Sequence, residues 1–318
     1  MKNKKIGSML LRFSRPLVLV ILFIFFSIFT DTFWSLNNWS NVKNILLQQA
    51  PFNILLAACM TISIILNGID LSLGASVALI TCICGILLRN TGNAVLAISV
   101  ALTIGAIVGL INGVLIAIIK VPTFVATYAM RWVLNGLALV LLGGYQIYDL
   151  GPTFRKIFIS NSWTFFIIMI VVVLILNFVM SRTVFGYRVY ATGMNANAAR
   201  ISGIRTSKVT ISIYVLSGLI IGLVSVMYLA NLGTAEPNIG GNFAINAVAA
   251  TLVGGTTIGS GNGKMSNAIV GALIMLVLTN GMIQIGVPSV WQQFIVGTVI
   301  ILSIVMERVL QKVAAHYE

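Results

Sequence analysis

Residues 94–119 read AVLAISVALTIGAIVGLINGVLIAII, a run of 26 residues that contains no charged side chain. A helix needs about 20 predominantly apolar residues to cross the hydrocarbon core of a bilayer. The rest of the chain has the same character, since 59% of its 318 residues are hydrophobic and only 8% are charged. This composition predicts an integral membrane protein and excludes a disordered chain, a secreted disulfide scaffold and a cytosolic enzyme.

Apolar runs separated by polar breaks predict an all-α, polytopic fold of about ten transmembrane helices. The eighth run is short and rich in glycine, so we expect a broken or re-entrant helix whose backbone is covered by protein or by a water-filled cavity. The predicted spans are 16–36, 50–67, 70–88, 94–119, 122–145, 163–181, 209–231, 244–258, 265–286 and 289–306.

Basic residues give the direction of these spans, because cytoplasmic loops of membrane proteins carry an excess of Lys and Arg. With the N-terminus inside, the cytoplasmic segments hold 14 of the 19 basic residues and the outer loops hold four. The net charge of +13 therefore reflects membrane topology rather than nucleic-acid binding. We expect cytoplasmic tails over 1–15 and 307–318, and a transmembrane domain over 16–306.

The longest predicted cytoplasmic loop, 182–208, carries five basic residues and no acidic residue. Asn195 is a suitable N-cap for a short helix from Ala196 to Ser202, and Gly203 is a suitable residue to end it. Such a helix lying on the membrane could dock a soluble partner. The loop could also serve only to anchor the topology.

No catalytic or metal-binding constellation is present in the sequence. The glycine-rich segment from Gly255 to Lys264 lacks the spacing of a phosphate-binding loop, because position 258 is Ile and position 265 is Met. The single histidine, His316, lies near the C-terminus. The cysteines lie in apolar stretches and are expected to be small buried hydrophobic residues.

Polar residues inside the predicted spans are candidates for a translocation path or gate. Asp70 is an ionisable group at membrane depth, which makes it a candidate functional residue, but with Gly68 just before it the sequence favours the N-cap of the third span, and the two roles are compatible. Arg131 lies within the fifth span, with Asn135 one turn further on the same face. Several uncharged amides and hydroxyls in the spans would suit a hydroxyl-rich solute better than an ion. The full set of path or gate candidates is Asn67, Asp70, Ser72, Asn112, Arg131, Asn135, Asn246 and Thr251.

Five motifs occur in order along the chain. They are GIDLSLG at 68–74, VPTFVAT at 121–127, TVFGYRVYATGMN at 183–195, AARISGI at 198–204 and AATLVGGT at 249–256. These motifs resemble those of the permease subunits of bacterial ABC importers for monosaccharides, the ribose-type family. The resemblance covers roughly residues 45–306.

The resemblance implies a multi-pass protein of the bacterial inner membrane with a type II ABC importer fold, surrounded by membrane lipid. It further implies a second permease copy, an external solute-binding protein and a cytoplasmic ATPase that binds ATP and Mg. This chain would bind no cofactor and would catalyse nothing itself. The ATPase-coupling loop would be 186–205, with Gly186, Arg188, Asn195, Ala198, Ala199 and Gly203 as its contact residues.

The chain also departs from the family pattern. Residues Ala244 and Asn246 stand where relatives usually have acidic residues, and Asn197 stands where they often have Glu. Two other classes of function are a self-sufficient secondary transporter and a membrane anchor without transport. A secondary transporter would normally carry more intramembrane acids or histidines for ion coupling.

Overall fold

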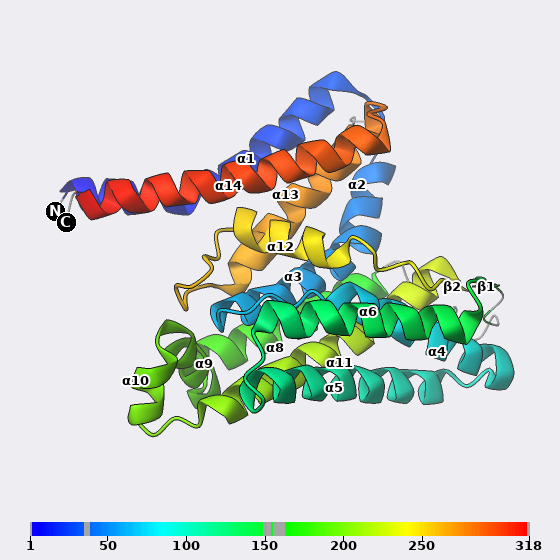
Figure 1. The fold of residues 1–318 in the computed structure, drawn as a ribbon. Helices are drawn as coiled ribbons and strands as arrows, with labels where there is room; N and C mark the ends of the chain where they lie inside the picture. The colour runs from blue at the N-terminus through cyan, green and yellow to red at the C-terminus, as the bar shows by residue number, and fades with distance from the viewer. Residues whose placement is uncertain (1, 35–38, 149, 151–153, 155–162, 317–318) are drawn as a thin grey trace.

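The computed structural model describes residues 2–34, 39–148, 150, 154 and 163–316, and these residues are mostly helical (Figure 1). Within them, seven helical segments are long and apolar enough to cross a membrane: Ser40–Ile65, Leu73–Thr91, Ala94–Ala117, Thr123–Leu142, Thr164–Arg182, Thr206–Leu232 and Met265–Gln284. Shorter apolar helices at Arg15–Phe29, Phe243–Val253 and Ser289–Ser303 occupy the other predicted positions. Within the described residues, each predicted apolar run therefore contains a helix.

The elements follow the chain in simple order. The first half contains α1 (Lys2–Phe29), α2 (Ser40–Asn44), the π-helical turn η1 (Ile45–Gln49), α3 (Ala50–Ile65), α4 (Leu73–Thr91), α5 (Ala94–Ala117), α6 (Thr123–Leu142) and β1 (Ile147–Tyr148). The second half contains α8 (Thr164–Arg182), α9 (Val184–Met194), α10 (Ala196–Ile201), α11 (Thr206–Leu232), β2 (Thr234–Ala235), α12 (Phe243–Val253), α13 (Met265–Gln284) and α14 (Ser289–His316).

Several helix boundaries differ from the predicted ones. The second span begins at Ser40, because η1 joins α2 to α3 and Pro51 lies in the first turn of α3, where its missing N–H is tolerated. Helices α1 and α14 each contain 28 residues and continue into the predicted tails. At 1.5 Å per residue each measures about 42 Å, more than the roughly 30 Å hydrocarbon core.

One small sheet departs from the predicted all-α class. Strands β1 and β2 pair antiparallel, with Ile147 opposite Ala235 and Tyr148 opposite Thr234. The sheet lies at the end of the molecule opposite α9 and α10 (Figure 1). It joins the loops that follow α6 and α11, a long-range pairing that hydropathy alone does not reveal. The predicted outer basic residues Arg155 and Lys156 lie outside the described residues.

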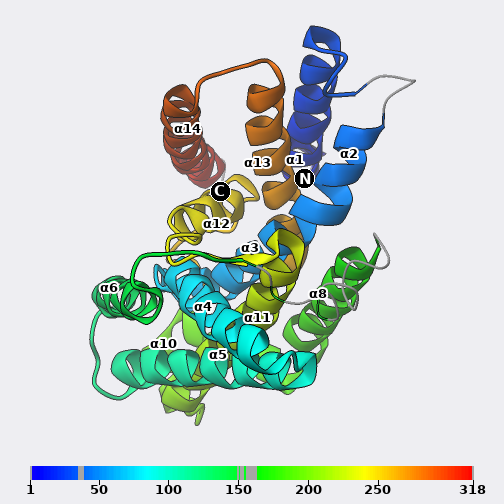
Figure 2. The same cartoon turned by 90° about the vertical axis from the view of Figure 1, so that its right-hand side faces the viewer.

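Close helix packing at the centre depends on small residues. A Cβ on Gly105 of α5 would meet the backbone carbonyl of Gly218 on α11, and a Cβ on Gly218 would meet that of Gly105. Small residues at such positions let two membrane helices approach backbone to backbone. Helix α3 is buried along almost its whole length, and Figure 2 shows it behind α4, with α5 and α6 further out.

The eighth span forms a short helix, as its glycine content predicted. Helix α12 has 11 residues, about 16 Å, which is half of the hydrocarbon core. The segment before it packs directly on α4, since a Cβ on Gly240 would collide with the backbone of Gly74. Protein therefore covers irregular backbone at this point, as a membrane environment requires.

Candidate functional site

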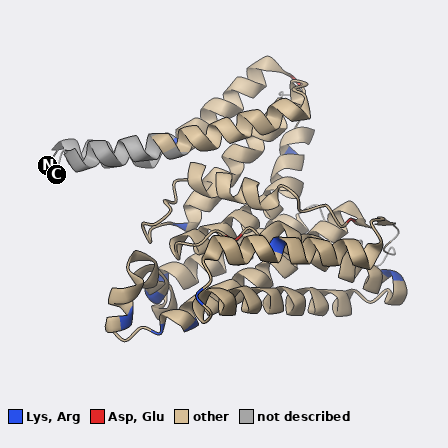
Figure 3. Cartoon of the chain, in the orientation of Figure 1, with Lys and Arg blue, Asp and Glu red and all other residues tan. Residues whose placement is uncertain are grey.

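The basic loop 182–208 folds into two helices, α9 and α10, and the first turn of α11. Several Lys and Arg residues lie at this end of the molecule, where the ribbon is coloured blue (Figure 3). Helix α9 turns back from α8 at Gly186, where a Cβ would collide with the carbonyl oxygens of Val179 and Met180. The hydroxyl of Thr183 caps α9 by accepting a hydrogen bond from the Gly186 N–H at 3.2 Å.

The predicted cap of the short helix α10 is confirmed. Asn195 Oδ1 accepts hydrogen bonds from the N–H groups of Asn197 and Ala198, each at 3.0 Å. Gly203 has a φ of +85°, the left-handed conformation that glycine adopts without strain. Local sequence was enough to predict this element because all of its determinants lie within nine residues.

The expectation that Ala198 and Ala199 both face a partner is wrong for Ala199. Its side chain is only 5% exposed, whereas Ala198 and Asn195 are exposed. Adjacent residues on a helix point about 100° apart, so a single helix face cannot present both. Ala199 packs on its own chain, and Ala198 remains available to a partner.

Helix α9 is fastened to two loops of the transmembrane domain. Asn67 Nδ2 donates a hydrogen bond of 2.6 Å to the carbonyl of Gly193 in α9. Asn67 has a φ of +61°, and Asn is one of the residues that tolerate this conformation. Tyr190 OH donates a hydrogen bond of 2.8 Å to the Gly263 carbonyl in the loop between α12 and α13. Burial raises the pKa of the Tyr190 phenol, which keeps the proton that it donates.

Asp70, Ser72 and Asn112 form one buried network. Asp70 accepts hydrogen bonds from the N–H of Ser72 at 3.0 Å and from its hydroxyl at 2.6 Å. Asn112 Nδ2 donates to Ser72 Oγ at 2.8 Å, and its own amide oxygen is buried without a hydrogen-bond partner among the described residues. The interpretation of Asp70 as a helix N-cap is wrong, since α4 begins at Leu73 and Asp70 instead closes the turn that precedes it.

The other candidate residues for a translocation path or gate lie in three separate places. Arg131 Nη2 donates to the Gly241 carbonyl at 3.1 Å, next to the start of α12, and Asn135 follows one turn later on α6. Asn246 lines a cavity of about 30 Å³ together with Asn53 and Thr279. Thr251 is fully buried, and its hydroxyl lies 2.8 Å from the Ala247 carbonyl of its own helix and 3.2 Å from the Ala57 carbonyl of α3, so it connects α12 to α3.

Sequence reasoning missed three residues with defined roles. Tyr190 was not singled out, although it fastens α9. Asn53 lies on the cavity. Asn41 bridges helices by donating to Asn280 Oδ1 at 2.8 Å and accepting from Gln284 Nε2 at 3.1 Å. The sequence signal available for Asn41 was a polar amide side chain at the start of an apolar run.

These helices, their buried polar networks and the basic helical loop define a multi-pass membrane transport permease. Residues 41–304 match the family described as the branched-chain amino acid transport system / permease component, and the chain belongs to that family. It is the permease of a bacterial ABC importer and is not itself catalytic.

Curated relatives match over nearly the whole chain. The ribose import permease of Escherichia coli (strain K12) is 32% identical over 302 residues, covering 92% of both chains. That of Bacillus subtilis (strain 168) is 36% identical over 295 residues, covering 91% of this chain and 90% of the relative. The galactose/methyl galactoside import permease of Escherichia coli (strain K12) is 30% identical, covering 96% of both chains. No solved structure matches.

Proposed function

We propose that this chain is the translocation subunit of an ATP-driven, binding-protein-dependent importer of a monosaccharide or a similar small polyhydroxylated solute. Relatives named for ribose, fructose and galactose support the solute class. Uncharged hydrogen-bonding groups also favour it, because Asn246, Asn53 and Thr279 share a cavity and the Asn112 amide oxygen has no partner in the described part of the chain.

In this proposal the chain crosses the membrane ten times and both termini are cytoplasmic. The seven long apolar helices and three shorter ones supply the crossings. The excess of basic residues in 182–208 supports a cytoplasmic position for this loop. A second permease copy, identical or paralogous, completes the pathway, and an external binding protein delivers the solute. A cytoplasmic ATPase binds ATP and Mg and docks on the exposed face of α10.

The observation that carries the proposal is the double attachment of α9. The permease family is not itself catalytic, so force from ATP hydrolysis in a partner must enter through a surface contact. A displacement of α10 would move α9, which pulls the 66–72 turn through Asn67 and the 254–264 loop through Tyr190. The first loop leads to the Asp70–Ser72–Asn112 network, and the second leads to α12, beside the cavity.

Uptake of the solute into reconstituted vesicles tests this proposal. The permease with its co-purifying ATPase and binding protein should import the solute only when ATP is present. The solute itself comes from a ligand screen on that binding protein. Import by the permease alone would establish a secondary transporter instead.

A further inference from the structure

A groove runs between α9 and the beginning of α11, with a volume of about 430 Å³. We call it the basic groove. It is lined by Phe185, Arg188, Gly203, Ile204, Arg205, Lys208, Val209 and Ser212. Arg188 and Gly203 are also predicted contacts of the coupling loop, but the two hydrogen bonds that attach α9 to the rest of the chain involve no residue that lines the groove.

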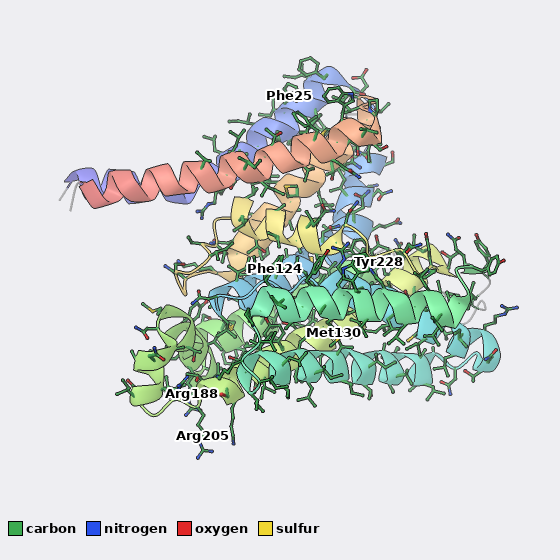
Figure 4. The ribbon with its side chains drawn as sticks, in the orientation of Figure 1. Phe25, Phe124, Met130, Arg188, Arg205 and Tyr228 are labelled. Carbon is green, nitrogen blue, oxygen red and sulfur yellow. The ribbon has the colours of Figure 1, made fainter. Side chains whose placement is uncertain are left out.

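The basic groove is built for a negative charge. Arg188, Arg205 and Lys208 are all exposed, and the lining residues include no Asp or Glu. Figure 4 labels Arg188 and Arg205 at the same end of the molecule. Helix α11 begins here at Thr206, and Arg205 at its N-cap position makes no side-chain capping bond. The first-turn amides of α11 therefore add to the positive potential of the three side chains.

The basic groove also has an apolar side, which continues along α11, one of the helices long and apolar enough to cross a membrane. Phe185, Ile204 and Val209 supply its hydrophobic wall. Ser212 lies six residues into α11, about 9 Å beyond its start. On the face of α11 that carries Lys208 and Ser212, the next turns present Leu216, Leu219 and Leu223, which are all partly exposed. Positive charge at one end and a partly exposed apolar face at the other match the shape of a phospholipid.

We propose that the basic groove binds the phosphate headgroup of an anionic phospholipid of the cytoplasmic leaflet, with the acyl chains along α11. Basic pockets between helices at the cytoplasmic surface are suited to such headgroups. An acidic surface of the ATPase fits less well, since the groove extends to Ser212 inside the predicted span, where a soluble protein does not reach. A bound lipid would join Arg188 of α9 to Arg205 and Lys208, and would so brace the coupling helices.

Lipid retention by the purified full chain tests the proposal. The groove variant Arg188→Gln/Arg205→Gln/Lys208→Gln is compared with the control Arg182→Gln/Arg200→Gln/Lys264→Gln, which removes the same charge from exposed positions outside the groove. Each protein is mixed with dioleoyl phosphatidylglycerol, which is anionic, or with dioleoyl phosphatidylethanolamine, a zwitterionic comparison lipid with no net charge. Bound lipid is counted by native mass spectrometry. The wild type and the control should retain phosphatidylglycerol in preference, and the groove variant should bind it roughly tenfold or more weakly.

Three results would overturn the proposal. Equal weakening in both variants would mean diffuse attraction to anionic lipid without a defined site. Unchanged retention in the groove variant would place the lipid elsewhere. Loss of ATPase binding in lipid-free detergent, with lipid retention unchanged, would make the groove a protein docking site. Circular dichroism and size-exclusion profiles of each variant separate these outcomes from misfolding.

Discussion

The Asp70 carboxylate orders the turn between α3 and α4 by accepting two hydrogen bonds from Ser72. An asparagine oxygen can accept the same two bonds, whereas leucine cannot. We therefore expect Asp70→Asn to retain assembly and most uptake. Asp70→Leu should lower the free energy of unfolding by about 1–3 kcal/mol, because it leaves the Ser72 donors buried and unpaired. Thermal unfolding in detergent and vesicle uptake measure the two effects. Normal assembly without uptake in Asp70→Asn would mean that transport needs the charge itself.

Asn67 combines a left-handed backbone with a hydrogen bond to α9. Asn67→Gly keeps the backbone conformation and removes only the amide. We expect this variant to assemble normally, with a loss of about 1 kcal/mol from the missing bond, and to respond poorly to the loaded binding protein. The measurement is stimulation of ATP hydrolysis in the assembled importer. Asn177→Ala, which removes the same amide from an exposed position on α8, is the control. Full stimulation in Asn67→Gly would remove Asn67 from the coupling mechanism.

At the level of elements, α10 exposes Ala198 and buries its neighbour Ala199. Ala198→Glu should leave membrane insertion intact and weaken ATPase binding, because the added carboxylate would be unpaired at the contact. Ala199→Glu should instead reduce folded protein, since it places a charge among buried groups of its own chain. Pull-down of the ATPase and the yield of folded permease distinguish them. Tyr145→Glu, 79% exposed at the opposite end, is the control. Unaltered ATPase capture by Ala198→Glu would exclude this face as the dock.

Elements with local determinants could be predicted from the sequence. The apolar runs predicted the helices, and Asn195 and Gly203 predicted the two ends of α10. The glycines of the eighth run predicted a short helix. In each of these cases the deciding residues lie within a few turns of one another, so no knowledge of tertiary packing was needed.

The buried side of each helix, and the contacts between residues far apart in the sequence, could not be predicted in the same way. Lipid is as apolar as a protein core, so hydropathy does not reveal which side of a membrane helix is buried. Leu219 on α11 is exposed although Ile213 on the same helix is fully buried. Asn67 and Gly193 are 126 residues apart, and the accepting group is a main-chain carbonyl that carries no sequence signature.

For the whole molecule, the basic-residue bias predicts that α9 and α10 lie inside and the β1–β2 sheet outside. A cysteine at Ile201, which is 89% exposed, should react only with reagents that enter the cell. A cysteine at Tyr145 should react with an impermeant reagent. The natural cysteines are buried, so the unmodified chain gives the background. Labelling of Ile201→Cys from outside would reverse the topology.

The two attachments of α9 both end on main-chain carbonyl oxygens, those of Gly193 and Gly263. A carbonyl is present whatever residue supplies it, so the position of the backbone matters more than the identity of that side chain. Chimeric permeases that take the 254–264 loop from a relative should consequently stay coupled when the loop length is kept. Insertion of one residue before position 263 should uncouple them by moving the acceptor away from Tyr190. ATP-dependent uptake by the two chimeras compares these outcomes, and equal uptake would show that the loop transmits nothing through this bond.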